Sequence, residues 1–423
     1  MIKRSFFSLT PQRLVYDLPE PDLKEPESIP LPASLSILLS EAIDSTKQTL
    51  LKKGDTVKKG EKLRLYDDST AYTISPVAGT IKLFDSYSDD FGKIATFIVI
   101  KPDKNPASEA DTIKLDTIED IKFADKFLRK LPGAPPFGIL ANDDIKIKTI
   151  VITCADTDLL STTSQFIGLM YTDEIKAGAK ILKAMTQVPK LCIAIPEALS
   201  TRVNFDSIQV IKTSNLYPST LPAMIMKDHL NMILPAGKTP EDMGVCFIRA
   251  EALVSLARVF QTKEAVFDKI LTIISKNGTR FRVHATIGTP LSNIFTQFNL
   301  HVNERDRIIV GGPMRGFATF TPHQPVRPDM DTIIIQDRDI IPQLSDYPCV
   351  NCGNCIRICP ANIPVNLLVR YLEADQYEEA ADRFDLGSCI ECGLCAYVCT
   401  ARIPLYQYIR LGKHELLTLR ADA

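Results

Sequence analysis

CVNCGNCIRICP at residues 349–360 and CIECGLCAYVCT at residues 389–400, the first and second arrays, decide how the last quarter of this chain folds. Each array places four cysteines in the spacing C-x2-C-x2-C-x3-C, which is typical of proteins with two [4Fe–4S] clusters. In that pattern the first three cysteines of a run bind one cluster and the fourth binds the other. The spacing therefore predicts cluster I on Cys349, Cys352, Cys355 and Cys399, and cluster II on Cys389, Cys392, Cys395 and Cys359.

The residues around these cysteines carry further expectations. The fourth cysteine of each array is expected to begin a helix that points away from the nearer cluster. Pro360 follows the fourth cysteine of the first array, and Thr400 takes the corresponding position in the second. We expect this difference to affect only the start of the helix in the second array. Gly353 and Gly393 lack side chains, so their backbone can approach a cluster sulfide and donate hydrogen bonds to it. Residues 363–387 have a helical period, which predicts a helical type of two-cluster domain.

Zinc is the alternative metal for two groups of four cysteines. Zinc sites usually combine paired C-x2-C units, whereas each array has four cysteines in one run, so iron–sulfur clusters are favoured. Eight of the 11 cysteines lie in the two arrays. Because the sequence also has no export signal, disulfides are not expected. The remaining Cys154, Cys192 and Cys246 lie in apolar strands and are expected to be small buried hydrophobic residues.

The composition is that of a soluble globular protein with several domains. Of the 423 residues, 45% are hydrophobic and 24% are charged, and the net charge is −2. No block of like charge indicates a nucleic-acid partner, and none is expected. No apolar run is long enough to span a bilayer, and the first residues lack the pattern of a secretory signal. We therefore expect a cytoplasmic protein, held on the inner face of the cell membrane only through partner subunits.

Sequence patterns divide the chain into five parts. These are a proline-rich arm at 1–33, a barrel-sandwich hybrid domain at 34–102, an α/β core at 103–262, a β-grasp domain and connector at 263–345, and a two-cluster domain at 346–423. The arm is either a linker or surface arm, or a strap that docks along a partner subunit. The core alternates strand and helix patterns, which predicts a largely parallel sheet, and residues 164–185 predict one long helix within it.

The second part has the turn pattern of a carrier domain. KGDTVKKGEKL at 53–63, with turns at Gly54 and Gly60, and SPVAGTI at 75–81 resemble the barrel-sandwich hybrid fold of biotinyl and lipoyl domains. Such carriers present a lysine in a Met-Lys-Met hairpin, and this sequence has no such tripeptide. We therefore predict a structural copy of the fold rather than a swinging carrier.

The order of the parts resembles the C subunit of Rnf complexes, which are ion-translocating ferredoxin:NAD oxidoreductases. The resemblance covers most of the chain from about Lys52 on. Its strongest pieces are IGTPLSNIF at 287–295, IIVGGPMRGFA at 308–318, the second array, and IPLYQYIR at 403–410. The Nqr A subunit has a similar architecture. The resemblance implies an α/β multidomain fold with a nucleotide-binding-like core, an SLBB-like β-grasp segment and a helical C-terminal two-cluster ferredoxin domain.

In that family the core is similar to the NADH- and FMN-binding subunit of respiratory complex I, but its cofactor segments are altered here. A GGAGFPT-type loop that cradles the flavin phosphate is replaced by KLPGAPPFG at 130–138, where prolines remove backbone donors. An ECEPY-type segment is replaced by CADTDL at 154–159, and a YPQGGE-like piece by YPST at 217–220. We therefore do not expect FMN.

The altered segments define a vestigial cofactor site. Its candidate residues are Gly133, Gly138, Asp156 and Asp158. A partial site built by the two aspartates is left open, because a fold can persist while its site chemistry is replaced.

The leading hypothesis is an electron-transfer subunit of an Rnf/Nqr-like, membrane-associated oxidoreductase complex. Its partners would be the other subunits of that complex, together with a soluble redox donor such as ferredoxin or a flavoprotein. One alternative is an NADH dehydrogenase subunit that holds FMN in a divergent site, and another is a structural adaptor with redox-inert clusters. Arg357 and Lys413 beside the arrays are expected to be solvated charges, and residues 311–314 to form a turn after a strand.

Overall fold

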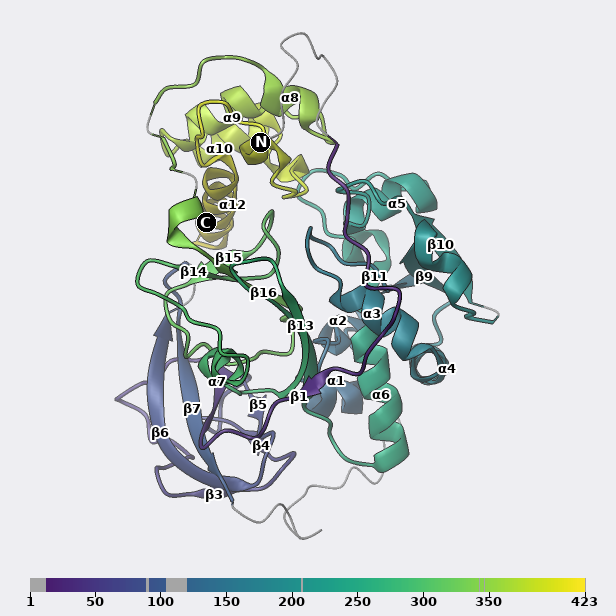
Figure 1. Ribbon diagram of the computed structural model, residues 1–423, viewed down its shortest axis with the longest axis vertical. Helices are drawn as coiled ribbons and strands as arrows, with labels where there is room; N and C mark the ends of the chain where they lie inside the picture. Colours follow the sequence, from purple (N-terminus) through teal and green to yellow (C-terminus); the bar gives the residue numbers. More distant parts are fainter. Residues whose placement is uncertain are drawn as a thin grey trace.

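A mixed sheet lies between a barrel, an α/β core and a helical C-terminal part (Figure 1). In that view the barrel lies at the lower left, the core at the right and the helical part at the top. This computed structural model describes residues 13–88, 91–103, 120–206, 208–341, 343–345 and 347–422. No helix among the described residues is both long and apolar enough to cross a membrane.

The barrel consists of short antiparallel strands. The strands are β2 (Leu35–Leu39), β3 (Thr56–Val57), β4 (Lys62–Leu63), β5 (Thr73–Ile74), β6 (Gly79–Ser88) and β7 (Ile94–Pro102), in sheets of order β2-β7-β6-β3 and β4-β5. Burial alternates along β2, so Leu35, Ile37 and Leu39 face the interior. The predicted turns at Gly54 and Gly60 have φ of 97° and 83°, values that favour glycine. The strands and turns agree with the predicted barrel-sandwich pattern.

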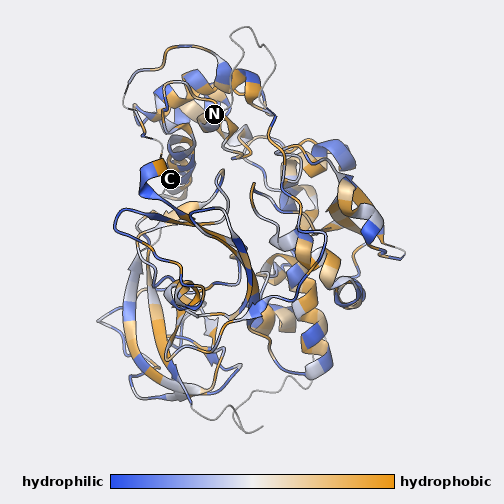
Figure 2. Ribbon diagram, in the orientation of Figure 1, coloured by the Kyte–Doolittle hydropathy of each residue, from blue (hydrophilic) through white to orange (hydrophobic). Residues whose placement is uncertain are grey.

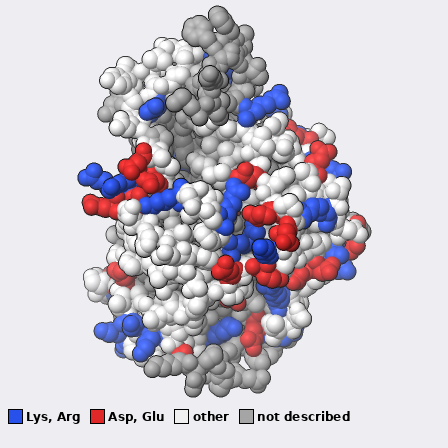
Figure 3. Space-filling view, viewed as in Figure 1, with Lys and Arg blue, Asp and Glu red and all other residues white. Residues whose placement is uncertain are grey.

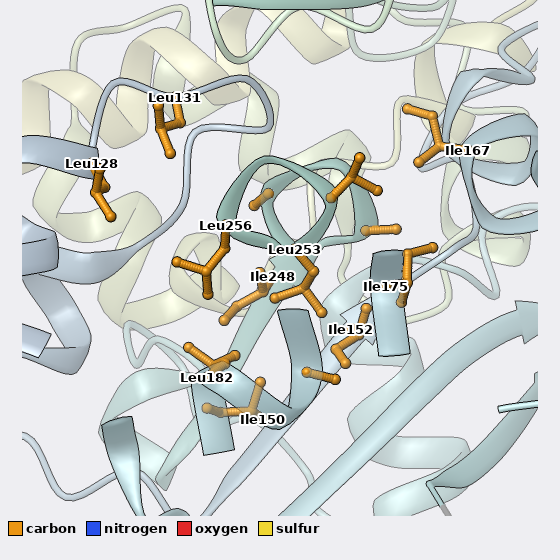
Figure 4. Packing of buried hydrophobic residues seen from close by; sticks show 14 of the residues in the cluster. Leu128, Leu131, Ile150, Ile152, Ile167, Ile175, Leu182, Ile248, Leu253 and Leu256 are labelled. Atoms are coloured by element: carbon orange, nitrogen blue, oxygen red, sulfur yellow. The ribbon is translucent and has the colours of Figure 1, made fainter. Parts of the chain in front are cut away.

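The core contains a parallel sheet covered by helices, as the alternation predicts. The sheet has the order β10-β9-β8-β11, formed by β8 (Thr149–Thr153), β9 (Lys190–Pro196), β10 (Gln209–Thr213) and β11 (Val245–Arg249). The helices are α1 (Ile121–Leu128), α2 (Phe137–Leu140), α3 (Thr163–Met170), α4 (Thr172–Thr186), α5 (Pro222–Leu230) and α6 (Ala250–Thr262), with 3-10 turns at Glu197–Arg202 and Glu241–Met243. Leu253 and Leu256 of α6 gather with Ile150 and Ile152 of β8 in the hydrophobic centre (Figure 4). Cys154, Cys192 and Cys246 are buried in this core, as expected.

The prediction of one long helix over 164–185 was wrong. Tyr171 separates α3 from α4 with φ of −114° and ψ of 38°, which is outside helical geometry. After this break, α4 packs closely on α6, because Gly178 lies against the backbone of Leu253. Hydrophobic periodicity continues across the break, so it did not reveal the change of direction.

The mixed sheet is formed by strands of residues 263–345, the part predicted as β-grasp and connector, together with β1 from the N-terminal arm. Its order is β1-β13-β12-β16-β14-β15, formed by β1 (Glu27–Ser28), β12 (Asp268–Ile274), β13 (Arg280–Thr286), β14 (Arg307–Val310), β15 (Phe317–Thr319) and β16 (Thr332–Gln336), with α7 (Leu291–Gln297) beside it. A buried ionic network joins it to the core. Lys269 on β12 pairs with Glu251 at the start of α6, and its ammonium lies 3.2 Å from Asp331. Buried charges require such partners.

The described part of the N-terminal arm packs along its own chain. Tyr16 is buried, and its backbone N–H donates to Asn215 over 2.8 Å. Asp17 pairs with Arg280, and β1 adds a parallel strand to β13. Residues 1–12 lie outside the described residues. Proline content identified an extended segment but not the surface that the segment follows.

The C-terminal part is helical, as predicted. Its helices are α8 (Asn354–Ile358), α9 (Val365–Leu372), α10 (Tyr377–Phe384), α11 (Leu394–Tyr397) and α12 (Leu405–Asp422), with a 3-10 turn at Leu386–Ser388; another 3-10 turn, Arg338–Ile340, precedes this part. Hydrophobic and hydrophilic residues alternate along these helices (Figure 2). Their apolar faces meet around Leu368, Ile403 and Ile409, next to cysteines of both arrays.

Charged side chains of both signs are mixed on the molecular surface. On the face shown in Figure 3, lysines and arginines lie interspersed with aspartates and glutamates across the middle of the molecule. Neighbouring charges of opposite sign offset one another at the surface, so this face presents no extended field of one sign.

Candidate iron–sulfur site

Two hollows lie side by side in the helical part, and each is lined by four cysteines. The first is lined by Cys349, Cys352, Cys355 and Cys399. The second is lined by Cys359, Cys389, Cys392 and Cys395. These are the two sets that the spacing predicts, with the fourth cysteines exchanged between the arrays. Among the described residues, no three or more His, Cys, Asp or Glu side chains are close enough to share one metal ion.

A glycine sets the path of each array. Gly353 and Gly393 both have φ of 72°, and each immediately precedes a short helix, α8 or α11. This left-handed conformation strains residues with side chains. The chain therefore turns after the second cysteine and places the third cysteine in the first turn of a helix.

The expectation that the fourth cysteine begins a helix was wrong. Cys359 follows α8 in an extended conformation, and the next helix begins only at Val365. Cys399 likewise lies between α11 and α12. The short helix inside each array already uses the residues before the fourth cysteine, and Pro360 cannot donate a helical hydrogen bond.

Thr400 acts across the arrays rather than on a helix start. Its hydroxyl lies 3.5 Å from Cys352 Sγ, and both residues line the first hollow. The expectation of a local effect on helix geometry was therefore wrong. A hydroxyl at this position donates to a sulfur that a proline could not reach with a hydrogen bond.

The two sets differ in burial. Cys352 is exposed and Cys349 half-buried in the first set, whereas Cys392 and Cys395 are buried in the second. Burial raises the pKa of the Cys392 thiol to about 12. A buried thiol stays protonated at neutral pH unless a metal binds its sulfur, since a coordinating thiol loses its proton outright. The donor set of the second hollow therefore suits a metal cluster better than free thiolates.

The loop of the second array is held by donors from outside the array. Tyr217 Oη donates to the Cys392 carbonyl over 2.6 Å, and Arg315 Nε donates to the Glu391 carbonyl over 3.2 Å. Lys413 Nζ donates to the Cys389 carbonyl over 2.6 Å and to Glu391 Oε1 over 2.8 Å. The expectation of a solvated charge at Lys413 was therefore wrong.

The corresponding loop of the first array is held from within the helical part. Arg357, which is exposed as expected, donates to the Cys352 carbonyl over 3.1 Å. Arg370 on α9 donates to Asn351 Oδ1 over 2.8 Å. The first loop therefore depends on its own domain, whereas the second also depends on the core.

Asp158 positions one of these external segments. Its carboxylate accepts from the backbone N–H groups of Met314 over 3.1 Å and Arg315 over 2.7 Å, and its side chain fits against Gly312. The Met314 carbonyl in turn lies against Gly393, leaving no room for a side chain there. The predicted turn after β14 is present, and it also connects Asp158 to the second array.

Asp156 stabilises the start of α3. Its carboxylate accepts from Ser161 Oγ over 2.7 Å and from the backbone N–H groups of Ser164 and Gln165 over 3.0 and 3.1 Å. Burial raises the pKa of this carboxyl, and these hydrogen bonds oppose the rise. The carboxylates of both candidate aspartates thus accept hydrogen bonds from other residues of the protein.

The candidate glycines make separate contacts. Gly133 has φ of 86°, packs on the backbone of Ala252 at the start of α6, and donates its N–H to Pro328 over 2.9 Å. Gly138, in α2, lies against Arg129. These glycines contact α6 and α1, whereas the aspartates contact α3 and the 312–315 turn.

Sequence reasoning missed Tyr217, Arg315 and Tyr16. Tyr16 lies against Tyr217, with ring centroids 5.3 Å apart, and both belong to a hydrophobic cluster that includes Cys392. One signal existed, because Tyr217 is the part of the YPQGGE-like piece that this sequence keeps. Nothing in the local sequence connects Arg315 to the second array.

Two family matches cover parts of the chain. Residues 22–105 match the RnfC barrel sandwich hybrid domain, and residues 348–403 match the 4Fe-4S dicluster domain. The matches lie on the barrel and on the two arrays. The chain thus contains an iron–sulfur cluster domain of the dicluster type.

Curated relatives align along most of the chain. The C subunit of the ion-translocating oxidoreductase complex of Vibrio cholerae is 27% identical over 83% of this chain and 48% of its own length, and that of Haemophilus influenzae 26% over 84% and 46%. The chain thus spans about half the length of these relatives. The C subunit of the proton-translocating ferredoxin:NAD(+) oxidoreductase complex of Clostridium ljungdahlii is 24% identical over 92% of this chain and 89% of its own length. An NAD+-reducing [NiFe]-hydrogenase structure covers 65% of this chain and 57% of that chain at 11% identity, with a TM-score of 0.40, too low to support an argument.

Proposed function

Because this chain belongs to the RnfC family, we propose that it relays electrons as a subunit of an Rnf-type oxidoreductase complex, using two [4Fe–4S] clusters held by the two arrays. The observation that carries this proposal is the pair of four-cysteine hollows. When bound, the clusters supply sites that gain and lose single electrons. A hollow suits a cubane, in which each thiolate binds a different iron, whereas four ligands of one zinc ion lie about 2.3 Å from it.

The arrangement of the helices supports a relay between the two sites. Cys355 lines the first hollow and Cys359 the second, and α8 connects them. Four residues of helix advance about 6 Å along the axis, so the hollows are close neighbours. Electron transfer between neighbouring sites therefore needs no movement of the chain.

The first array is the side on which we place the redox partner. Cys352 is exposed there, and the nearby Tyr347 and Val350 are 76% and 65% exposed. Exposed aromatic and apolar side chains are enriched in interface centres. The second set is turned inward, where Tyr406 and Ile409 line the hollow and exclude water. We propose that other subunits of the complex hold the chain peripherally on the inner membrane face and exchange electrons through the first array.

Iron and acid-labile sulfide analysis of the anaerobically purified chain tests this function. Two cubanes require about eight iron atoms per chain. EPR-monitored redox titration should show two reducible centres. Four iron atoms or fewer, or clusters that stay silent throughout the accessible range, would contradict the relay, and silent clusters would support the adaptor alternative.

The alternative of an FMN-holding NADH dehydrogenase receives no support from the contacts of the candidate aspartates. Asp156 and Asp158 accept hydrogen bonds from α3 and from the 312–315 turn. An added ligand would have to replace those bonds. Flavin fluorescence after acid release, together with bleaching of the clusters by NADH, would favour this alternative over the relay.

A further inference from the structure

A cavity lies where the barrel, the core and the mixed sheet meet, apart from both cysteine hollows. Its volume is about 400 Å³. Its lining comes from β2 and β5 of the barrel, from the segment between α1 and α2, and from residues 325–329. Asp156 and Asp158 are not part of the lining. Its size suits a small-molecule ligand.

Most of the cavity wall is apolar. Ile37 and Ile74 line it from the barrel, and Phe267, Ile287 and Val326 line it from the mixed-sheet part. These five side chains are all buried. A wall of this kind holds the apolar body of a ligand and leaves orientation to a few polar groups.

Lys130 provides one of those polar groups. It lines the cavity and is half-buried, and it makes no hydrogen bond or ion pair with any residue that the structure describes. Burial lowers the pKa of its ammonium group. A cation removed from water without a hydrogen-bonded partner is costly, so this position is unfavourable unless an anion reaches it.

Arg327 provides the second polar group. Its Nε lies 3.4 Å from Asp329 Oδ1, but it is buried and has no hydrogen-bond partner among the described residues. The guanidinium also stands over the Phe317 ring, 5.4 Å from its centroid. Arg129 lines the cavity too, but it is paired with Asp125. Two cationic groups therefore face the cavity with unused donors, against the single carboxylate of Asp329.

We propose that this cavity binds a small organic anion with an apolar, ring-containing body and one phosphate, sulfonate or carboxylate group. The anionic group contacts Lys130 and Arg327, and the body packs on Ile74, Phe267 and Val326. The hydroxyls of Ser36 and Thr73 also line the cavity and can complete the hydrogen bonds of the anion. This proposal does not depend on the relay function, because no cysteine of either array contributes to the cavity.

The probe for this site is 8-anilinonaphthalene-1-sulfonate, an aromatic anion whose fluorescence rises in apolar surroundings. N-phenyl-1-naphthylamine carries the same rings without the sulfonate and reports apolar binding alone. Both are titrated into the full-length chain and into Lys130→Met, Arg327→Met and Lys126→Met. The last is the matched control, because Lys126 is exposed on α1 and outside the cavity.

We expect Lys130→Met and Arg327→Met each to weaken binding of the sulfonate about tenfold, since each removes a charge-assisted hydrogen bond. Binding of the neutral amine, and both titrations of Lys126→Met, should remain unchanged. Equal sulfonate affinity for all four proteins would overturn the proposal, as would equal losses for the two dyes.

Thermal unfolding of the ligand-free proteins gives a second, independent test. Lys130→Met should leave the midpoint unchanged or raise it, because an unpaired cation is removed from a half-buried position. A structural role for Lys130 predicts a lower midpoint, and that result would contradict the proposal even if the dye data were ambiguous. Iron content measured on the same samples separates any effect on the arrays from an effect on the cavity.

Discussion

The two arrays share a spacing and a backbone conformation but differ in their surroundings. Gly353 and Gly393 have the same φ, and each array closes with a short helix. The first array lies near the surface and is held by arginines of its own domain, whereas the second is held by Tyr217 of the core and Arg315 of the turn after β14. The motif therefore determines which atoms face a cluster, and the rest of the chain determines how that cluster is exposed and held.

Removal of one cysteine from either array should have the largest effect. Cys355→Ala and Cys395→Ala should each lower the iron content from about eight to about four atoms per chain, because each removes one ligand of one cubane. Iron analysis and EPR measure the loss. Cys395→Ala should also lower the thermal midpoint more, because its hollow faces the core. If both variants lost all the iron, the two sites would not be separable.

Asp158→Asn should lower the free energy of unfolding and change the reduction potential of cluster II but not of cluster I. The amide cannot accept hydrogen bonds from both Met314 and Arg315 without turning its own N–H₂ toward a donor. We expect a loss of about 2–3 kcal/mol in the free energy of unfolding, the value of hydrogen bonds to a charged group. Denaturant titration measures this loss.

The same variant should shift the potential of cluster II alone. EPR redox titration is the measurement. Asp120→Asn serves as the control, because Asp120 only caps exposed α1 through the Phe123 N–H. Equal shifts in both clusters would contradict the view that Asp158 acts on the second array.

Lys413→Met and Arg357→Met form a matched pair of charge removals. Lys413 contacts the second array and Arg357 the first, so each variant should make the potential of its own cluster more negative. A nearby positive charge stabilises the reduced cluster, which carries more negative charge. The shift at Lys413 should be larger, because its removal leaves Glu391 unpaired in a half-buried position. EPR titration of both clusters in both variants measures these shifts. A larger shift of cluster I in Lys413→Met, or of cluster II in Arg357→Met, would contradict the prediction.

Thr400→Val should have the smallest effect. It removes a hydroxyl 3.5 Å from Cys352 Sγ without changing the side-chain shape. The potential of cluster I should become slightly more negative, since a hydrogen bond to sulfur favours the reduced state. The potential of cluster II should stay constant. A loss of iron in this variant would instead indicate that Thr400 is needed for assembly.

The sequence predicted features that depend on neighbours along the chain. The cysteine sets, the parallel sheet and the turns at Gly54 and Gly60 follow from spacing and periodicity. The break at Tyr171 was missed because hydrophobic residues continue on both sides of it. The contacts of Tyr217 and Lys413 were missed because they depend on where separate segments meet, and no local pattern records that meeting.

The candidate cofactor residues show the same limit. Asp156 and Asp158 were predicted to be remnants of a cofactor motif. Their contacts could not be predicted, because a carboxylate that binds a ligand and one that caps a helix look alike in a sequence.

Tyr217 also connects segments that are synthesised far apart in time. Tyr217 lies against Tyr16 and donates to the Cys392 carbonyl, a hydrogen bond that spans 175 positions. During synthesis the second array emerges after the barrel, the core and the mixed sheet, but before Lys413, which also holds it. Contacts this distant in sequence form slowly, because large loops must close first. The second array is therefore synthesised after Tyr16 and Tyr217, and a chain that stopped before Cys392 would leave the Tyr217 hydroxyl without this carbonyl acceptor.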